Sequence, residues 1–277
     1  MRIAFVGRAG SGKTTCGAVF SRYVAAQGVP VLSVDAGAHP RLGAALGIQV
    51  TPPPAPAWLD EHPRGTPTVG EPVRRHARIV DLDPAGELLG GHTVAASDGV
   101  RLLVTNAVGP LLDHLADGER EYVVLDLAAD AFATGLCTRF DMTVLVTEPT
   151  RRDVEAYRPC AEKASAHGVE LRVLGNKISD WGDAAWLTEQ MGDALVGCVG
   201  HSAWVRAAER GTAGSVSGLE PGNTVALAAM RAALDGCRRA VGAQRRTREM
   251  QQGDTAAMES RQCHPAEVAV AYSASSR

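Results

Sequence analysis

A glycine-rich loop between a buried strand and a helix constrains this chain more than any other feature. Residues 2–6 (RIAFV) form a continuous apolar run, the loop GRAGSGKT follows at residues 7–14, and residues 13–27 have the apolar spacing of a helix. The loop satisfies the pattern GxxxxGK[ST] in the strand–loop–helix context that this pattern requires. Glycines let backbone N–H groups turn inward around phosphate oxygens, and the helix start adds its positive dipole end. The loop therefore predicts a polyphosphate-binding site.

Other residues complete the predicted nucleotide site. Lys13 is expected to bridge the β- and γ-phosphates, while the Thr14 hydroxyl ligates Mg²⁺. A second carboxylate on the Mg²⁺ side should end a later apolar strand, and Asp126 ends the run YVVLD. Asn176 and Lys177, at the end of the strand in RVLGNKI, are predicted to contact the base, with an ordinary Asx turn as the alternative. The predicted nucleotide-binding residues are Gly7, Gly10, Ser11, Gly12, Lys13, Thr14, Thr15, Asn176 and Lys177, with Lys13, Arg8 and Asp126 as catalytic candidates.

The fold class follows from apolar runs that recur along the chain. The runs are continuous rather than alternating, which is typical of strands covered on both faces of a mostly parallel sheet. They lie at residues 2–6, 31–35, 100–105, 122–126, 143–147, 171–175 and 195–199, and helical patterns lie at 13–27, 108–117, 151–167, 183–191 and 223–240. Gly28 and Gly168 stand where helix stops belong. The pattern predicts a three-layer α/β P-loop NTPase fold with a roughly seven-stranded central sheet flanked by helices.

Two segments fall outside this alternation. Residues 50–97 are rich in proline and glycine and are expected to be a long insertion with little regular structure. Residues 241–277 are polar with few large apolar side chains, which is typical of a disordered tail. We therefore expect one P-loop domain over residues 1–240, followed by that tail.

Composition narrows the class of partner. The 277 residues carry 28 basic and 31 acidic side chains, and no long basic run favours nucleic acid or a membrane surface. The start MRIAFVGRAG lacks the apolar stretch and cleavage site of a signal peptide, and no segment approaches eighteen uninterrupted apolar residues, so a cytoplasmic protein is expected. The six cysteines show no CxxC or CxC spacing and are expected to be inert thiols.

With these motifs in view, the chain resembles the MinD/ParA-type ATPases with a deviant Walker A loop. It is most similar to the accessory ATPases that insert nickel into carbon monoxide dehydrogenase. The resemblance rests on GRAGSGKTT, VPVLSVDAGAHPRLGAALG, DGVRLLVTNAV, EYVVLDLAAD, VLVTEPTRRDVEAY and VLGNKI, and it fades after VGCVGHSAWVRAAERGTAG. It implies face-to-face dimerisation driven by ATP, a Mg²⁺ requirement, slow hydrolysis, and a conformational signal passed to a client protein.

Departures from the family pattern bear on catalysis. The family has a lysine after its first loop glycine that reaches the partner's phosphates. Arg8 stands there, and either keeps that contact or is a solvent-facing loop residue. The second of the family's two switch aspartates is Gly37 in this chain, which puts water activation in doubt. The family's glycine after the Walker B aspartate aligns with Asp130, which repels a triphosphate unless it replaces the missing acid.

Candidate metal ligands and charged residues were weighed in the same way. The nickel-insertion family has a Cys-x-Cys where this chain reads LLVTNAVGPLLDHLADGE, so no nickel is predicted. Asp113 and His114 are adjacent on one helix and point about 100° apart, so a solvated pair is expected. His39 is either a general acid/base near the γ-phosphate or a turn cap. The arginines at 151 and 152 belong either to an interface or to a solvated face.

Three functions are compatible with the sequence. The first is an ATP-dependent dimerising switch that matures or assists a client. The second is a pseudo-ATPase that binds nucleotide without turnover, because Gly37 and Asp130 replace residues of the hydrolytic route. The third is a small-molecule kinase in which the segment 50–97 forms a lid over the acceptor, with Arg64, Arg74, Arg75 and Arg78 as its basic residues. The sequence favours the first and leaves the client unidentified.

Overall fold

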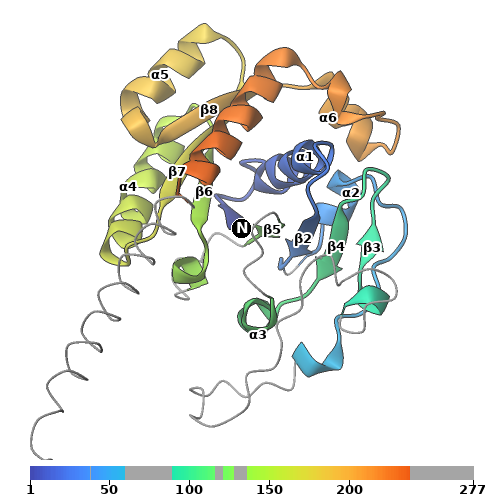
Figure 1. The fold of residues 1–277 in the computed structure, drawn as a ribbon. Coiled ribbons are helices and arrows are strands. Elements are labelled where there is room, and N and C mark those ends of the chain that lie inside the picture. The colour runs from blue at the N-terminus through green and yellow to red at the C-terminus, as the bar shows by residue number, and fades with distance from the viewer. Residues whose placement is uncertain (38, 60–88, 116–120, 128–135, 238–277) are drawn as a thin grey trace, which may run out of the picture. The chain divides into compact units, whose positions relative to one another are not determined.

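A sheet of eight strands forms the centre of the computed structural model, which describes residues 1–37, 39–59, 89–115, 121–127 and 136–237 (Figure 1). The strand order is β3-β4-β2-β5-β1-β6-β7-β8. All neighbours pair in parallel except β3, which is antiparallel to β4. The strands are β1 (Arg2–Val6), β2 (Val31–Asp35), β3 (Val94–Ala95), β4 (Arg101–Val104), β5 (Tyr122–Asp126), β6 (Met142–Thr147), β7 (Leu171–Ile178) and β8 (Leu195–Gly200).

Helices cover both faces of this sheet and make the structure three-layered (Figure 1). On one face α1 packs across the central strands, with Phe20 against Phe5, and a helical segment that begins at residue 221 lies over β8. On the other face α3 and α4 enclose a core with the inward side chains of the strands. The helices are α1 (Lys13–Ala25), α2 (Leu42–Ala45), α3 (Val108–His114), α4 (Arg151–Ala166), α5 (Trp181–Met191) and α6 (Ala203–Glu209).

The continuous apolar runs of the sequence correspond to strands buried on both sides. Every residue of β2, β5 and β6 is buried, because helices cover both faces of the sheet at these positions. The three-layer α/β fold with a mostly parallel sheet is therefore confirmed. Gly28 and Gly168 have φ values of 74° and 64°, so the predicted helix stops adopt the left-handed conformation that glycine tolerates.

The strand count is one larger than the seven apolar runs predict. All seven predicted strands form, and the eighth is the two-residue β3, which lies inside the segment expected to be irregular and is too short to show a pattern. The short helices α2 and α6 were not predicted either. The described ends of the 50–97 segment also contain two short 3₁₀ turns, at Ala57–Leu59 and Gly90–His92. Residues 60–88 of that segment, and the predicted tail from 241 onward, lie outside the described residues.

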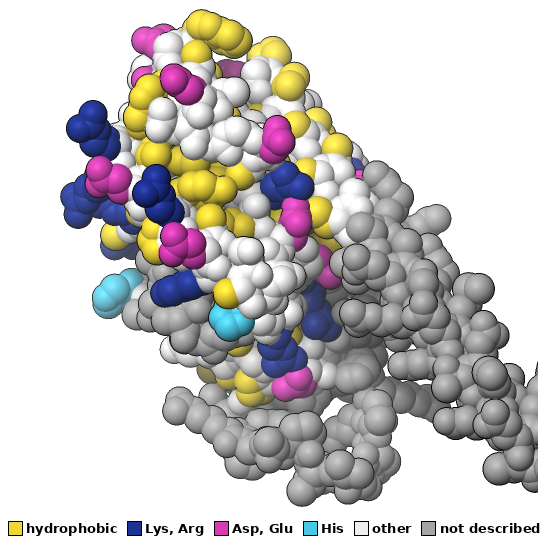
Figure 2. Space-filling view, turned by 90° about the vertical axis from the view of Figure 1, so that its left-hand side faces the viewer, with side chains coloured by type: hydrophobic (Ala, Val, Ile, Leu, Met, Phe, Trp, Pro, Cys, Tyr) yellow, Lys and Arg dark blue, Asp and Glu magenta, His cyan; other side chains and the backbone are white. Residues whose placement is uncertain are grey.

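Chain contacts divide the protein into Met1–Asp235 and Gly236–Arg277, and every strand and helix labelled above lies in the first unit. On the side that carries α4 and α5, basic and acidic side chains are interspersed around hydrophobic ones (Figure 2). Trp181, at the start of α5, is 84% exposed. None of the helices within the described residues has the length and apolar character needed to cross a membrane.

The parallel register brings the chemistry-bearing residues to one edge of the sheet. Phe5 pairs with Asp126 and Asp35 pairs with Asp126, so the ends of β1, β2 and β5 are level. The glycine-rich loop begins where β1 ends. In open parallel sheets the carboxyl ends of the strands form the ligand-binding edge.

Candidate functional site

The glycine-rich loop adopts a shape that only glycine allows at two of its positions. Gly7 and Gly12 have φ values of 154° and 89°. A Cβ on Gly7 would lie 2.7 Å from both the Ser11 hydroxyl and the Val146 carbonyl oxygen. A Cβ on Gly12 would lie 2.1 Å from the side-chain nitrogen of Asn176. The loop is therefore packed tightly against β6 and β7, and Gly12 leads directly into α1.

Two side chains of β7 hold the loop in this shape. The Asn176 amide donates to the carbonyl of Ser11 at 2.7 Å, and the Lys177 ammonium donates to the carbonyl of Gly10, also at 2.7 Å. Lys177 also forms an ion pair with Glu148 at 2.7 Å and has a positive φ of 60°. These two hydrogen bonds satisfy loop carbonyls with donors from β7. A glycine-rich turn of this kind can bind an anion through its backbone N–H groups.

This bracing role was not anticipated for Asn176 and Lys177. Sequence reasoning placed them at the end of a strand, whereas β7 continues through both to Ile178 with a register irregularity after Gly175. Both side chains also line the smaller of two cavities around the loop. Base contact by these two residues stays a prediction, and each already donates one hydrogen bond to the loop.

The larger cavity, of about 670 Å³, lies on the phosphate side of the loop. Lys13 and Thr14 line it from the first turn of α1, and Asp126 lines it from the end of β5. The cavity therefore gathers the ammonium of Lys13, the carboxylate of Asp126 and the hydroxyl-bearing residues Thr14 and Thr15 of the predicted site. Its lining also includes Gly10, Gly12, Asp35, Gly37, His39, Arg41 and Glu209.

The Thr14–Asp126 pair has the character of a cation site. The Thr14 hydroxyl donates to one oxygen of Asp126 at 2.6 Å, and the other oxygen is buried without a partner within the described part of the chain. Burial raises the pKa of Asp126 to about 6. The Asp35 carboxylate adds to this rise, and the Thr14 hydroxyl and the Lys13 ammonium oppose it. An unpaired buried carboxylate oxygen beside a hydroxyl matches the oxygen ligands that Mg²⁺ prefers, so these residues fit the predicted ion.

The raised pKa of Asp126 predicts that this carboxylate destabilises the metal-free protein. With divalent cations chelated, Asp126→Asn is expected to be more stable than the native chain at pH 7 by about 3 kcal/mol, from a shift of roughly two pKa units. Below about pH 4 the carboxyl is protonated in both folded and unfolded chains, so the difference vanishes there. The native chain loses stability as the pH rises through about 6. Urea unfolding between pH 4 and pH 7.5 measures the effect.

A matched variant separates this effect from a general loss of charge. Asp193→Asn removes an exposed aspartate of the 3₁₀ turn Gly192–Ala194, which follows α5, and is expected to shift stability by less than about 0.5 kcal/mol across the same pH range. A constant difference between Asp126→Asn and the native chain at all pH values would contradict the interpretation.

Asp35 shapes the loop that faces the phosphates. Its carboxylate accepts hydrogen bonds from the backbone N–H groups of Gly37, Arg41 and Leu42 at 3.1, 2.7 and 2.7 Å. The aspartate therefore caps the turn before α2, a role that the sequence had offered to His39. His39 is exposed and lines the larger cavity.

Arg8 is held within its own chain. Its guanidinium contacts the carboxylate of Asp153 at 2.5 Å, and Asp153 lies in the first turn of α4 with 7% of its side chain exposed. Arg8 is therefore only partly exposed and is bound to α4 of its own chain, rather than being a solvent-facing loop residue. The sequence could not reveal this pair, because 145 positions separate its members and Asp153 reads as part of a helix start capped by Thr150.

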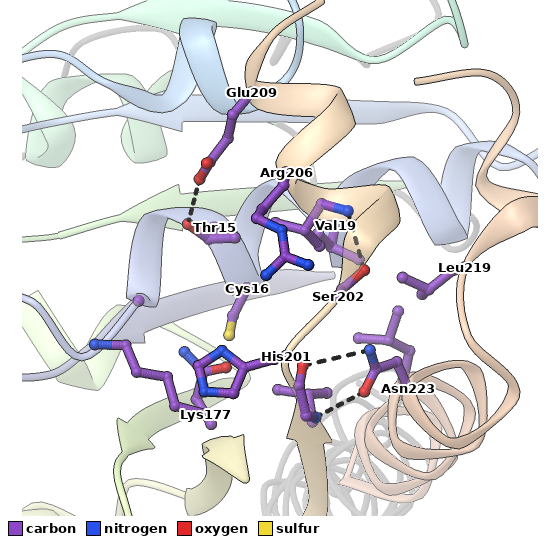
Figure 3. Close-up of a pocket in the computed structure, with 16 residues that line it drawn as sticks. Thr15, Cys16, Val19, Lys177, His201, Ser202, Arg206, Glu209, Leu219 and Asn223 are labelled. Carbon is purple, nitrogen blue, oxygen red and sulfur yellow. Dashed lines mark hydrogen bonds between the residues drawn. The ribbon is translucent and has the colours of Figure 1, made fainter. Parts of the chain in front are cut away.

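The smaller cavity, of about 290 Å³, lies beside α1, β7 and α6 (Figure 3). Much of its wall is apolar, with Val19 from α1, Val199 from β8, and Leu219 and Leu227 beyond α6. Such a slot suits the flat face of a nucleobase. Cys16 also lines it, and burial raises the pKa of this thiol to about 12, in line with an inert cysteine.

Several other predicted features lie away from the glycine-rich loop or outside the described residues. Asp130 lies outside the described residues, as does most of the predicted acceptor lid. Asp113 forms an ion pair with Arg139. The arginines at 151 and 152 are both exposed at the start of α4. Within the described residues no group of three or more His, Cys, Asp or Glu side chains is arranged to hold a metal ion.

Comparisons with known proteins bear on this site. No protein-family model matches the chain. An uncharacterised ATP-binding protein of Methanocaldococcus jannaschii is 26% identical over 193 residues, which cover 64% of this chain and 75% of that protein. The carbon monoxide dehydrogenase accessory protein CooC of Rhodospirillum rubrum is 24% identical over 229 residues, which cover 76% of this chain and 87% of that protein.

Solved structures share the fold. A ParA family ATPase of Chlorobium tepidum has a TM-score of 0.60 at 15% identity, covering 83% of this chain and 97% of that one. A chain of the MinC:MinD cell division complex of Aquifex aeolicus has a TM-score of 0.57 at 17% identity, with coverages of 87% and 95%. MinD of Pyrococcus horikoshii complexed with Mg-ADP has a TM-score of 0.55 at 15% identity, with coverages of 82% and 93%. The resemblance to MinD/ParA-type ATPases, including CooC, is thereby confirmed, and the fold is theirs.

Proposed function

We propose that this protein binds MgATP and dimerises face to face in response, and that the dimer passes a conformational signal to a client protein in a maturation or accessory role. The observation that carries the proposal is the braced loop at residues 7–14, with Lys13 and the Thr14–Asp126 pair facing one cavity. The similarity of the chain to an ATP-binding protein, to an accessory protein and to MinD complexed with Mg-ADP supports the proposal.

The residues of the site have distinct roles in this proposal. The loop N–H groups and the ammonium of Lys13 bind the phosphates, and Thr14 and Asp126 hold Mg²⁺. The bound ion would neutralise phosphate charge and orient the terminal phosphate. Asp35 accepts from the backbone N–H groups of Gly37 and Arg41, which both line the larger cavity, so the positions of these residues can respond to a γ-phosphate bound there.

Arg8 is the proposed contact between subunits. In the single chain it is paired with Asp153, so its guanidinium must leave that carboxylate before it can reach a partner's phosphates. A phosphate offers more negative charge than a carboxylate and accepts the same bidentate fork. Dimerisation would therefore exchange an ion pair within the chain for one between chains.

Measuring the assembly state with a non-hydrolysable ATP analogue and Mg²⁺ tests this proposal. The native chain is expected to shift from monomer to dimer with the analogue but not with MgADP. Arg8→Ala should weaken the dimer at least roughly tenfold, because a charged contact across the interface is lost. Asp153→Asn should tighten it roughly three- to tenfold, because Arg8 is released from its ion pair. Light scattering over a concentration series gives both values.

Arg158→Ala provides the control for this experiment. Arg158 is exposed on α4, one turn or more from Asp153, and its removal is expected to leave the dimer affinity within twofold of the native value. An analogue-bound chain that stays monomeric at high concentration would overturn the dimer proposal. Equal effects of Arg8→Ala and Arg158→Ala would overturn the role given to Arg8.

A second function, nucleotide binding without hydrolysis, is favoured by one observation. Gly37 has no side chain to position water, and Asp35 beside it already accepts three backbone hydrogen bonds. Among described residues the larger cavity has only Asp126 and Glu209 as further carboxylates. Phosphate release by the native chain that disappears in Lys13→Ala decides against this alternative.

A further inference from the structure

Glu209 stands where the two cavities around the loop meet. The larger cavity, on the side of Lys13, and the smaller apolar cavity share three lining residues, which are Gly12, Thr15 and Glu209. Glu209 is the last residue of α6, and its carboxylate accepts from the Thr15 hydroxyl at 3.5 Å (Figure 3). Gly12 and Thr15 belong to the loop and first turn of α1, so Glu209 is the shared residue that comes from the opposite wall.

A bound nucleotide would present its sugar at this junction. Its phosphates belong in the larger cavity with Lys13, and its base fits the apolar slot lined by Val19 and Val199. The ribose connects the two parts of the ligand, so it must pass the residues that both cavities share. Within the described lining of the smaller cavity, Glu209 is the one carboxylate.

The chemistry of Glu209 matches ribose hydroxyls. An ionised carboxylate only accepts hydrogen bonds, and the 2′- and 3′-hydroxyls of ribose can donate them. Acidic side chains serve this purpose at the ribose in dinucleotide-binding folds. The present bond from Thr15 is long, at 3.5 Å, and is easily exchanged for hydroxyl donors of a ligand.

The helix that carries Glu209 is tied firmly to α1. Ser202 caps its start by accepting from the Val205 N–H at 3.0 Å. The buried Arg22 of α1 lies 4.6 Å from the ring centre of Trp204 in a cation–π contact, and the indole of Trp204 donates to the carbonyl of Ser215 at 2.9 Å. These contacts fix α6 against the helix that begins the phosphate site, so Glu209 has a defined place at the junction.

We propose that Glu209 accepts hydrogen bonds from the ribose hydroxyls of the nucleotide and makes the site selective for ribonucleotides. This inference rests on the proposed nucleotide binding. It assigns to α6 a part in choosing the ligand, because Glu209 is the one carboxylate among the described residues that line both cavities. Removing Glu209 also removes a negative charge near the phosphates, so the ratio of two affinities is the informative quantity.

Titration calorimetry with MgATP and with Mg-2′,3′-dideoxyATP tests the proposal. The native chain is expected to bind ATP about tenfold more tightly, which is the loss expected for hydrogen bonds to one charged acceptor. In Glu209→Ala the ratio should fall to within about twofold of one, whatever happens to the absolute affinities. The 2′-deoxy and 3′-deoxy analogues show which hydroxyl carries the difference.

Two further variants keep the outcome clear. Glu209→Gln preserves shape and should lower the ratio to an intermediate value, which guards against a folding defect in the alanine variant. Glu189→Gln removes an exposed carboxylate of α5 and should leave the ratio unchanged. A native ratio near one, or a ratio retained in both Glu209 variants, overturns the inference alone. Failure of the native chain to bind ATP at all overturns the proposed function as well.

Discussion

Replacing Lys13 with alanine is expected to lower the affinity for MgATP by at least a hundredfold. The ammonium is the one lysine charge that lines the phosphate cavity among the described residues, and it lies close enough to Asp126 to lower the pKa of that carboxyl. Without this ammonium, less positive charge remains to offset the repulsion between the bound phosphates and the carboxylates that line the cavity, which are Asp35, Asp126 and Glu209. Charged hydrogen bonds to phosphate are among the strongest in proteins, and this one would form at a helix start, where the helix dipole also favours an anion. Isothermal titration of the variant measures the loss.

Lys163→Ala is the matched comparison for this prediction. Lys163 is exposed on α4 and should be replaceable with less than a twofold change in affinity. The same pair of variants, assayed for phosphate release, separates a working ATPase from a chain that only binds nucleotide. A Lys13→Ala protein that still binds MgATP within threefold of the native value would contradict the assignment of the phosphate site.

Most of the fold could be predicted because its strands are buried on both faces. A strand such as β6, with six consecutive buried residues, is mostly apolar, with four apolar side chains beside two threonines. Seven such runs separated by helical patterns predict a three-layer α/β architecture. The elements that were missed, β3, α2 and α6, are two, four and seven residues long. β3 and α2 are too short to impose a period on the sequence. α6 is as long as the predicted α3, but it buries only Trp204 and Ala208 and so leaves a weak pattern.

The candidate site was predictable only where its residues are neighbours in sequence. Residues 7–15 predict a phosphate loop because glycine, lysine and threonine must occur at fixed spacing around a polyphosphate. The contacts that brace this loop come from positions more than 160 residues away, as with Asn176 and Ser11. A pair such as Arg8 and Asp153 likewise depends on where α4 lies in the folded chain, which one sequence cannot reveal.

Gly12→Ala is expected to destabilise the folded chain by about 2 to 3 kcal/mol. Two costs combine in this variant. A non-glycine residue at a φ of 89° costs about 1 to 2 kcal/mol, and the new Cβ would lie 2.1 Å from the Asn176 nitrogen. Asn176 must then move away and give up its hydrogen bond to the Ser11 carbonyl, which costs about 1 kcal/mol more. Urea unfolding measures the sum, and nucleotide titration reports the accompanying distortion of the loop.

The neighbouring glycine and a double variant separate these two costs. Gly10 has nearly the same φ, 87°, yet a Cβ there would have no atom within 4 Å, so Gly10→Ala carries the backbone cost alone. Gly12→Ala combined with Asn176→Ala removes the clash and should be less destabilising than the sum of the single variants by about 1 kcal/mol or more. If Gly10→Ala and Gly12→Ala lose the same free energy of unfolding and the double variant is strictly additive, Asn176 does not clash with a side chain at residue 12. A larger loss of stability in Gly12→Ala than in Gly10→Ala would make β7 part of the phosphate site. The Asn176 side chain that blocks a methyl group at Gly12 would then also set the position of the backbone N–H groups on either side of Gly12.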